Sequence, residues 1–219
     1  MKFDKLLTTG KIWITSDTHY GHKNICRGVT NWRLPNGDIP EKQTRPFETI
    51  EKMNAAIVNN INEVVGQDDI LIHLGDWSFG GFEMIEEFRS RIFCKNVHLT
   101  FGNHDHHIEN NRQGCQGYFL SVSHYNTLKL GDYTFRLMHY PISSWDGLNK
   151  GVMHLHGHCH LPTNLRFGKG QRILINGKLD VNKHEDKTYT TVIVNEFYFI
   201  EVAEKKQETQ QQVTKSEEK

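Results

Sequence analysis

Side chains that can bind divalent metals follow five strand-like segments of this 219-residue chain. Apolar, extended runs precede Asp17-Thr18-His19, Gly75-Asp76, Gly102-Asn103-His104-Asp105, His139 and Gly157-His158-Cys159-His160. Asp, Asn and His are ligands of first-row divalent ions, and a sheet that delivers them from several strand ends can build a two-metal site. The pattern therefore predicts metal-dependent chemistry at the ends of several strands.

The order of these motifs (Asp-x-His, Gly-Asp, Gly-Asn-His-Asp, His, Gly-His-x-His) resembles that of the calcineurin-like metallophosphoesterase superfamily. The motifs run from Asp17 to His160, which is most of the chain. Asp-x-His and Gly-Asp occur by chance in many proteins, whereas Gly-Asn-His-Asp is expected in only about one chain in a thousand. All five in this order, each after a strand-like run, predict membership of the superfamily.

The resemblance implies two divalent ions that share one carboxylate. Asp76 would be the bridge, because an anionic group between two dications offsets their repulsion. The first ion would take Asp17, His19, Asp76 and His160, and the second would take Asp76, Asn103, His139 and His158. Imidazole with carboxylate suits Mn, our favoured ion, or Fe, Zn, Co or Ni, rather than Ca.

The resemblance also implies the reaction. A water or hydroxide that bridges both ions would attack phosphorus, while the ions stabilise charge on the non-bridging oxygens. His104 is assigned to no ion in this scheme. It would contact the scissile phosphate and protonate or stabilise the leaving oxygen. The alternative interpretation is that His104 is a structural histidine, hydrogen-bonded in a turn. Asp105 would either orient His104 or bond to the backbone.

Candidate substrate contacts follow the first ligand turn. His22 and Asn24 would either line the mouth of the cleft or shape the turn. Arg27, Arg33 and Arg45 flank a long polar loop, and a guanidinium group suits phosphate. We expect one arginine to reach the substrate, and we carry His22, Asn24, Arg27 and Arg45 forward as candidates.

The remaining histidines have ordinary structural explanations. His154, His156 and His73 precede ligand turns, and we expect them outside the site, with His156 the nearest to a supporting role. Solvent-facing positions are expected for His98, His106, His107, His124 and His184. Trp145 could stack on a base or pack in the core, and packing is favoured.

The segment after Asp76 narrows the class of enzyme. Protein Ser/Thr phosphatases of the superfamily carry Gly-Asp-x-x-Asp-Arg there, whereas this chain has Gly75-Asp76-Trp77-Ser78-Phe79-Gly80. Those phosphatases also lack a counterpart of His160. Both departures favour the branch of small phosphodiesterases, nucleotide phosphatases and other bacterial and phage enzymes, and they leave the partner of His104 open.

The leading hypothesis is hydrolysis of a phosphodiester in a small nucleotide-like substrate. The alternative with the same chemistry is a phosphomonoesterase, either a nucleotide or a protein phosphatase. From another class comes a non-catalytic metal-binding scaffold. The presence of His104 with all seven ligand candidates argues against the scaffold.

The elements that position these residues alternate between strands and helices in the first half of the chain. Strands are expected at 11–16, 69–74 and 96–101, and helices at 82–93 and from Pro46 to Gly66, after a polar loop at 28–45. The apolar stripe of the helix that starts at Pro46 would be Phe47, Ile50, Ile57, Ile61 and Val64.

The second half of the chain reads as β-structure. Strands are expected at 118–123, 126–130, 133–138, 151–156, 172–176 and 188–202, with Gly131-Asp132 as a hairpin turn. The resemblance implies a single α/β domain over 1–203, a β-sandwich flanked by helices in four α/β/β/α layers. Residues 204–219 are mostly Glu, Lys and Gln, and we expect a disordered tail.

Composition indicates a compact intracellular enzyme. Lys plus Arg equals Asp plus Glu at 26 each, so no global charge attracts the chain to nucleic acid or to a membrane. No apolar stretch approaches the roughly 20 residues of a membrane span. Cys26, Cys94, Cys115 and Cys159 form no close pair, which predicts reduced thiols and a cytoplasmic location. The sequence does not predict the oligomeric state.

Overall fold

The computed structural model describes residues 11–130, 133–160, 172–184 and 187–200, and the side chains only as far as residue 160. Its larger sheet has the strand order β4-β3-β2-β1-β8-β9. Strands β1 (Ile12–Thr15), β2 (Ile70–His73), β3 (Asn96–Thr100) and β4 (Ser121–Ser123) run parallel. Strands β8 (Arg172–His184) and β9 (Lys187–Ile200) extend this sheet in antiparallel pairing. The carboxyl ends of the parallel strands therefore meet at one edge, where α/β proteins bind ligands.

A smaller sheet has the order β5-β6-β7. Strands β5 (Asn126–Leu130) and β6 (Tyr133–Leu137) are antiparallel, and β7 (Met153–Leu155) lies parallel to β6. Because β6 and β7 are parallel, the turns that follow them also leave the sheet at one edge.

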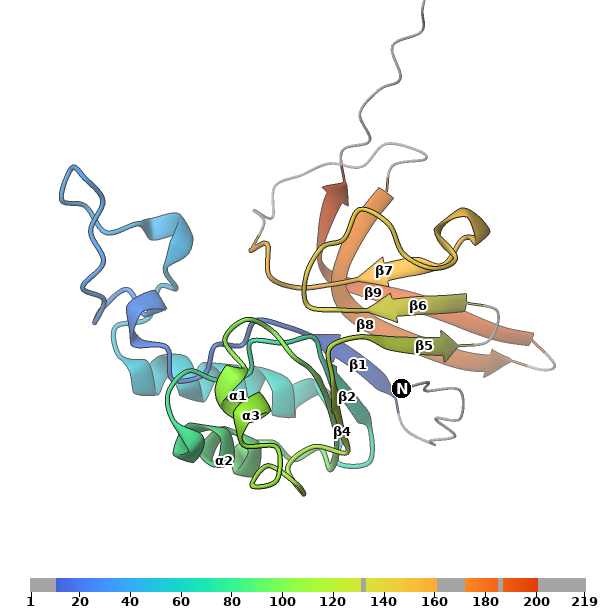
Figure 1. Ribbon diagram of the computed structural model, residues 1–219, viewed down its shortest axis with the longest axis horizontal. Coiled ribbons are helices and arrows are strands. Elements are labelled where there is room, and N and C mark those ends of the chain that lie inside the picture. The colour runs from blue at the N-terminus through green and yellow to red at the C-terminus, as the bar shows by residue number, and fades with distance from the viewer. Residues whose placement is uncertain (1–10, 131–132, 161–171, 185–186, 201–219) are drawn as a thin grey trace, which may run out of the picture.

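The alternation of side chains along β2 explains how the layers pack. Leu71 faces one apolar core with the helices, whereas Ile70 and Ile72 face a second core against the smaller sheet. Figure 1 shows the helices on one side of the β1–β4 strands and the β5–β7 strands on the other. This arrangement confirms the predicted β-sandwich, with the described α-helices against one of its two sheets. Within the described residues all three α-helices join the first core, so the outer face of the smaller sheet carries no α-helix there.

Helix α1 (Ile50–Val64) begins later than the sequence predicts. The chain bends at Pro46 and is not helical, because the carbonyls of Arg45 and Phe47 accept hydrogen bonds from the N–H groups of residues 27 and 28. The helix starts only where the Thr49 side chain accepts from the Lys52 N–H group. The predicted stripe was also partly wrong: Val64 is exposed, and the buried apolar residues of the helix are Met53, Val58 and Ile61.

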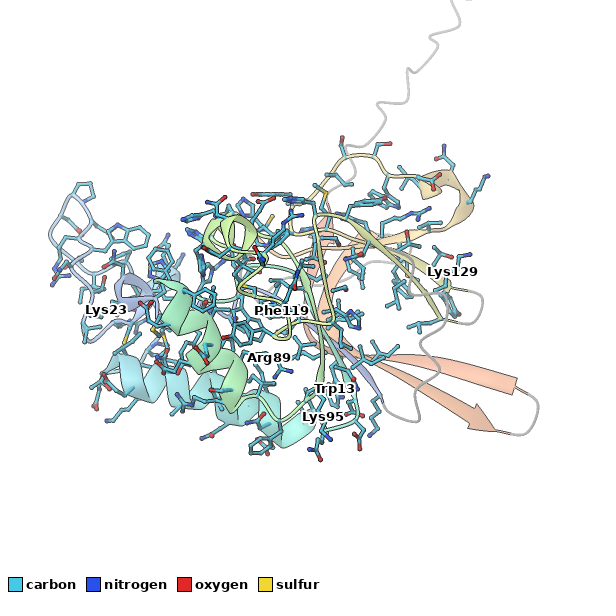
Figure 2. The ribbon with its side chains drawn as sticks, turned by 60° about the horizontal axis from the view of Figure 1, so that its bottom comes forward. Trp13, Lys23, Arg89, Lys95, Phe119 and Lys129 are labelled. Atoms are coloured by element: carbon cyan, nitrogen blue, oxygen red, sulfur yellow. The ribbon has the colours of Figure 1, made fainter. Side chains whose placement is uncertain are left out.

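Helices α2 (Phe82–Arg91) and α3 (His106–Asn110) complete the helical layer. Arg89 near the end of α2 donates hydrogen bonds to the carbonyls of Tyr118, Ile92 and Lys95, and so holds the connections that flank β3. Figure 2 labels Arg89 and Phe119, the buried core residue that follows Tyr118.

The strand predictions hold with changed lengths. Strands β4 and β7 are shorter than expected, and β8 is longer than the predicted 172–176. The predicted turn at Gly131-Asp132 and the predicted tail at 204–219 lie outside the described residues.

The segment between β1 and α1 projects from the body of the molecule, as the blue ribbon in Figure 1 shows. It contains two 3-10 turns, η1 (Lys23–Ile25) and η2 (Glu41–Gln43), and Figure 2 labels Lys23 on it. The predicted loop at 28–45 lies within this segment. All four cysteines are free thiols. None of the helices in the described part of the chain is long and apolar enough to cross a membrane.

Candidate metal centre

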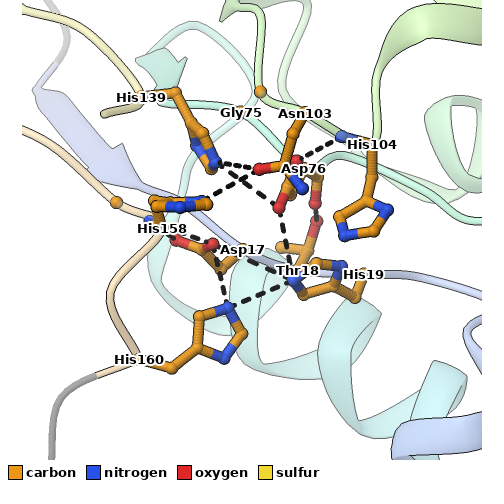
Figure 3. Close-up of polar contacts among 12 residues, drawn as sticks. Asp17, Thr18, His19, Gly75, Asp76, Asn103, His104, His139, His158 and His160 are labelled. Carbon is orange, nitrogen blue, oxygen red and sulfur yellow. Dashed lines mark hydrogen bonds and ion pairs between the residues drawn. The ribbon is translucent and has the colours of Figure 1, made fainter. Parts of the chain in front are cut away.

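The seven predicted ligands converge at one edge of the two sheets, as Figure 3 shows. Each comes from a turn that follows a strand: Asp17 and His19 after β1, Asp76 after β2, Asn103 after β3, His139 after β6, and His158 and His160 after β7. The larger sheet thus contributes Asp and Asn as well as one histidine, and the smaller sheet contributes histidine alone.

The backbone is left-handed at most of these positions. Asp17, His19, Asp76, His158 and His160 have φ values between 44° and 71°, and they are the only non-glycine residues with positive φ in the described ranges. Such a conformation is costly for residues with a Cβ atom, and it persists only where the surroundings impose it. Here the N–H groups of Asp17 and His19 donate to the carbonyls of Gly75 and Asp76, at 2.9 and 3.0 Å. Strain concentrated on five of seven candidate ligands indicates a functional site.

Glycines beside the ligands permit the close approach of these turns. A Cβ atom at Gly102 would overlap the Asp76 carboxylate, and one at Gly157 would overlap that of Asp17. Gly75 has a φ of 102°, and a Cβ atom there would lie 2.6 Å from Nδ1 of His139. Glycine is therefore required at all three positions for the two sheets to present their ligands together.

Asp17, His19 and His160 form the first candidate metal group. Nε2 of His160 lies 3.2 Å from Nε2 of His19 and 3.1 Å from Oδ1 of Asp17. Ligand atoms about 2.1 Å from one ion lie about 3–3.5 Å from one another. The donor types and their spacing therefore fit a divalent ion.

Asp76, His139 and His158 form the second candidate group. The amide oxygen of Asn103 joins it, at 3.0 Å from Nε2 of His139 and 2.9 Å from Nδ1 of His158. His139 Nδ1 lies 2.8 Å from the Leu74 carbonyl, a contact that requires the proton on Nδ1 and leaves Nε2 as the electron-pair donor.

Asp76 connects the two groups. Its Oδ2 atom lies 3.5 Å from Nε2 of His19 and 3.5 Å from Nε2 of His139. Its Oδ1 atom accepts a hydrogen bond from the His104 N–H group at 2.8 Å, so the carboxylate is fixed with Oδ2 between the groups. The structure thus brings all seven predicted ligands together around the predicted bridge, while their binding of metal stays a prediction.

Burial and charge prepare the first group for a cation. Burial lowers the pKa of His19 to about 2, so its imidazole is neutral and can donate an electron pair. Burial would raise the pKa of Asp17, but hydrogen bonds with His160 and Ser16 outweigh it, so the pKa lies below its usual value. The same hydrogen bond with Asp17 raises the pKa of His160. Asp17 is therefore anionic at neutral pH.

Arg45 supports the first ligand turn. Its guanidinium group donates to the carbonyls of Asp17 and Thr18, both at 2.6 Å. The sequence predicted a substrate contact for Arg45, and that contact stays a prediction; the contacts seen hold the turn that carries Asp17 and His19. The hydroxyl group of Thr18 contacts His73, which is fully buried, at 2.9 Å.

Asp105 holds the turns that carry Asp76 and Asn103. Its carboxylate accepts from the N–H groups of Asp76, Trp77 and Gly102 at 2.7–2.9 Å. Of the two roles that the sequence left open, the structure supports bonding to the backbone. Burial raises the pKa of Asp105 to about 6, although the three N–H groups favour its charged form.

His104 lies beside the first group. Its ring centroid is 5.3 Å from that of His19, and a nitrogen of His104 also falls within metal-ligand range of His19 and Asp76. Distances alone therefore allow either a ligand or an acid at this position, and the alternatives differ in what removal of the ring does to metal content.

The other substrate candidates occupy the projecting segment or its base. His22 is half-buried next to His104, with 6.2 Å between ring centroids. Asn24 is exposed on η1. Arg27 donates to the carbonyls of Glu41 and Thr44, and Arg33 to those of Thr30 and Trp32. Both arginines therefore brace the loop.

Several predictions for other histidines can be checked. His98 is buried and lies 2.7 Å from the Ser121 hydroxyl, so its predicted solvent-facing position was wrong. Val97 and Leu99 of β3 face the helices, so His98 between them faces the other side of the sheet. This alternation was the signal in the sequence for a buried His98. His107 is half-buried near Ser78, whereas His106 and His124 are exposed as predicted. The side chain of His184 lies outside the described residues.

His154 of β7, His156 directly after it and the nearby Trp145 make contacts typical of structural residues. His154 is buried and lies 3.1 Å from the carbonyls of both Arg136 and Tyr140. His156 is buried against the Gly157 carbonyl. Trp145 donates to the Val152 carbonyl and packs on His154, which supports packing over base stacking.

Two aromatic residues at the site had been overlooked as functional candidates. Tyr140 contacts the rings of His139 and His158 edge-on. Phe79 lies 5.3 Å from the ring of His104. The signals were their positions: Tyr140 directly follows a predicted ligand, and Phe79 stands where related phosphatases carry a second Asp.

The chain belongs to the calcineurin-like phosphoesterase family, whose model matches residues 10–196. It is therefore a metallophosphoesterase, a hydrolase of phosphoric esters from a family that generally uses divalent metals. An uncharacterized protein of Methanocaldococcus jannaschii is 32% identical over 152 residues, which cover 68% of this chain and 69% of that protein.

Two solved structures align with this chain. A protein of unknown function from Aquifex aeolicus aligns with 20% identity and a TM-score of 0.49, over 71% of this chain and 82% of that one. An archaeal phosphodiesterase aligns with 18% identity and a TM-score of 0.43, over 84% of this chain and 99% of that one.

Proposed function

We propose that this metallophosphoesterase hydrolyses a phosphodiester in a small nucleotide-like substrate, at a centre for two divalent ions with Mn favoured. The observation that carries the two-ion centre is Oδ2 of Asp76, which lies 3.5 Å from a histidine nitrogen of each candidate group. The first group would hold one ion through Asp17, His19, Asp76 and His160, and the second group would hold the other through Asp76, Asn103, His139 and His158. Bound there, the ions would supply positive charge to the phosphoryl oxygens and lower the pKa of a water molecule.

The protein residues would then position the phosphate and handle the leaving group. Oxygen from water forms the new bond to phosphorus, and the bond from phosphorus to the leaving oxygen breaks. His104 would donate a proton to that oxygen, because it lies beside the first group on the face of the site also reached by His22. The anchored Oδ1 of Asp76 holds the turn that carries His104, and so sets the donor's position.

The contacts of the three candidate arginines favour a diester over a monoester. A monoester carries three terminal oxygens and up to two negative charges, and its recognition commonly recruits guanidinium groups. Arg27, Arg33 and Arg45 instead donate to backbone carbonyls of the loop and of the first ligand turn. A diester has two terminal oxygens and one negative charge, so its recognition requires fewer guanidinium groups.

The test compares p-nitrophenyl phosphate with bis-p-nitrophenyl phosphate after reconstitution with Mn. We expect higher kcat/KM on the diester. A higher value on the monoester would make the protein a phosphomonoesterase, and hydrolysis of neither by metal-loaded protein would favour the non-catalytic scaffold. Asp76→Asn serves as the blank for contaminating activity. A panel of linear and cyclic nucleotides under the same conditions would then identify the substrate class.

A further inference from the structure

Phe79 and His22 form an aromatic pair beside His104. Their ring centroids lie 3.8 Å apart with an interplanar angle of 21°, which is a stacked arrangement. The Phe79 ring is 5.3 Å from that of His104 and the His22 ring is 6.2 Å from it. Although His22 covers one face of the ring, Phe79 remains 38% exposed. An aromatic surface is thus open to solvent next to the proposed proton donor.

The backbone holds this pair in place before any ligand binds. The Phe79 N–H group donates to the Tyr20 carbonyl at 2.7 Å, and Tyr20 forms an isolated β-bridge with Ser78. Gly21 has a φ of 81°, and a Cβ atom there would lie 2.9 Å from the Phe79 carbonyl oxygen. The segments that carry His19 and Asp76 are therefore held together, and with them the backbones from which the two rings project.

The residue type at this position is informative. Related protein phosphatases carry an Asp at the position of Phe79, where it supports the leaving-group histidine. Phenylalanine provides no such hydrogen bond, and it adds an exposed apolar face with a π-system. Such a face suits stacking on a planar ring, and stacking on a nucleic-acid base is tolerant of base identity.

The direction of the reaction decides which part of the substrate meets this face. If His104 protonates the leaving oxygen, the group attached to that oxygen must extend past His104. The Phe79–His22 pair lies next to His104, so the leaving group passes over it. We propose that Phe79, backed by His22, forms a subsite that stacks on the aromatic base of a leaving nucleoside. This inference rests on the proposed diesterase function and on the role of His104.

A matched pair of substrates tests the subsite. One is a dinucleoside monophosphate, and the other is its analogue in which the leaving nucleoside lacks its base. Phe79→Ala should lower kcat/KM about tenfold on the first substrate. It should change kcat/KM less than twofold on the second, because the missing base has nothing to stack on. Phe79→Trp should retain the preference for the base.

Phe93→Ala is the matched control, since Phe93 is 66% exposed beyond the opposite end of α2 and should affect neither substrate. Metal content and melting temperature are measured on every variant. Equal losses on both substrates would overturn the subsite and leave the diesterase function standing.

Binding of free adenosine provides a readout that does not depend on turnover. Wild-type protein loaded with Mn should bind adenosine, and Phe79→Ala should raise the dissociation constant about tenfold. Calorimetry or NMR measures both constants. If the wild-type protein hydrolyses no diester, the proposed function fails, and this measurement still decides the subsite. No adenosine binding by the wild type, or unchanged binding by Phe79→Ala, would overturn it.

Discussion

Asp76 is the residue on which both candidate metal groups depend. Oδ2 faces His19 and His139 at the same distance, and Oδ1 is occupied by the N–H group of His104. Asp76 lies within ligand range of His19 from the first group and is itself a member of the second group. Its negative charge is what two neighbouring dications require, and a neutral amide of the same shape lacks it.

Asp76→Asn should therefore lose more than 90% of turnover and bind less metal, while the fold survives because the change is nearly isosteric. The measurements are kcat on the preferred diester, metal content by mass spectrometry, and circular dichroism. A purified, metal-loaded variant that kept a tenth of wild-type turnover would contradict the shared bridge.

His104 can be distinguished from a metal ligand by the dependence of its effect on the leaving group. His104→Ala should keep both metals and lose roughly 10²–10⁴-fold in rate on a substrate whose leaving group needs a proton. On p-nitrophenyl esters the loss should be much smaller, because p-nitrophenolate leaves without protonation.

His139→Ala is the control for a ligand, and it should lose metal and fail on both kinds of substrate. Equal losses for His104→Ala at full metal occupancy would make His104 a phosphate contact, and loss of metal would make it a ligand.

At the scale of elements, the ends of the strands position the metal ligands, and the loops add the contacts that support them. The motifs predicted that metal ligands would gather at strand ends, and the parallel strands β1, β2 and β3 do bring Asp17, Asp76 and Asn103 to one edge. The start of α1 was not predictable, because it depends on the pairing of residues 45–47 with residues 27 and 28, which are distant in the sequence. The contacts of Arg45 with the carbonyls of Asp17 and Thr18 were also not predictable, because guanidinium groups suit backbone carbonyls as well as phosphate.

His98 on β3 gives a prediction about stability and pH. Burial lowers its pKa in the folded protein to about 4, whereas an unfolded chain has a value near 6.5. Between these pH values the unfolded chain binds a proton at His98 that the folded chain does not. The stability that neutral His98 gives to the fold is therefore fully present above about pH 6.5, and it is lost as the pH falls toward 4.

His98→Gln should remove this dependence, which is on the order of 2 kcal/mol across the window. The measurement is the free energy of unfolding by urea from pH 7 to pH 4. His106→Gln, at an exposed position, should follow the wild type. Parallel curves for His98→Gln and wild type would show that His98 does not titrate in this way.

At the scale of the whole molecule, the candidate centre joins the two sheets. The larger sheet supplies Asp17, His19, Asp76 and Asn103, while the turns after β6 and β7 of the smaller sheet supply the other three histidines. Ions bound between them would crosslink the sheets in the folded state and have no equivalent site in the unfolded chain. Metal binding should therefore stabilise the fold, by an amount that rises with the logarithm of its affinity.

Removal and replacement of metal should reveal both this link and the choice of ion. Chelator-stripped protein should melt at a lower temperature, and Mn should raise the melting temperature in a concentration-dependent manner, by RT ln(1 + [L]/Kd) in free energy. Mn or another first-row ion should restore activity best, because four histidines, one Asn and two Asp form a borderline ligand set. Mg and Ca should restore little of either property.

Asp76→Asn should show a much smaller rise in melting temperature with Mn, which separates binding at this centre from binding elsewhere. Full restoration of activity by Ca would contradict the ligand set, and a melting temperature indifferent to Mn would contradict the crosslink between the sheets.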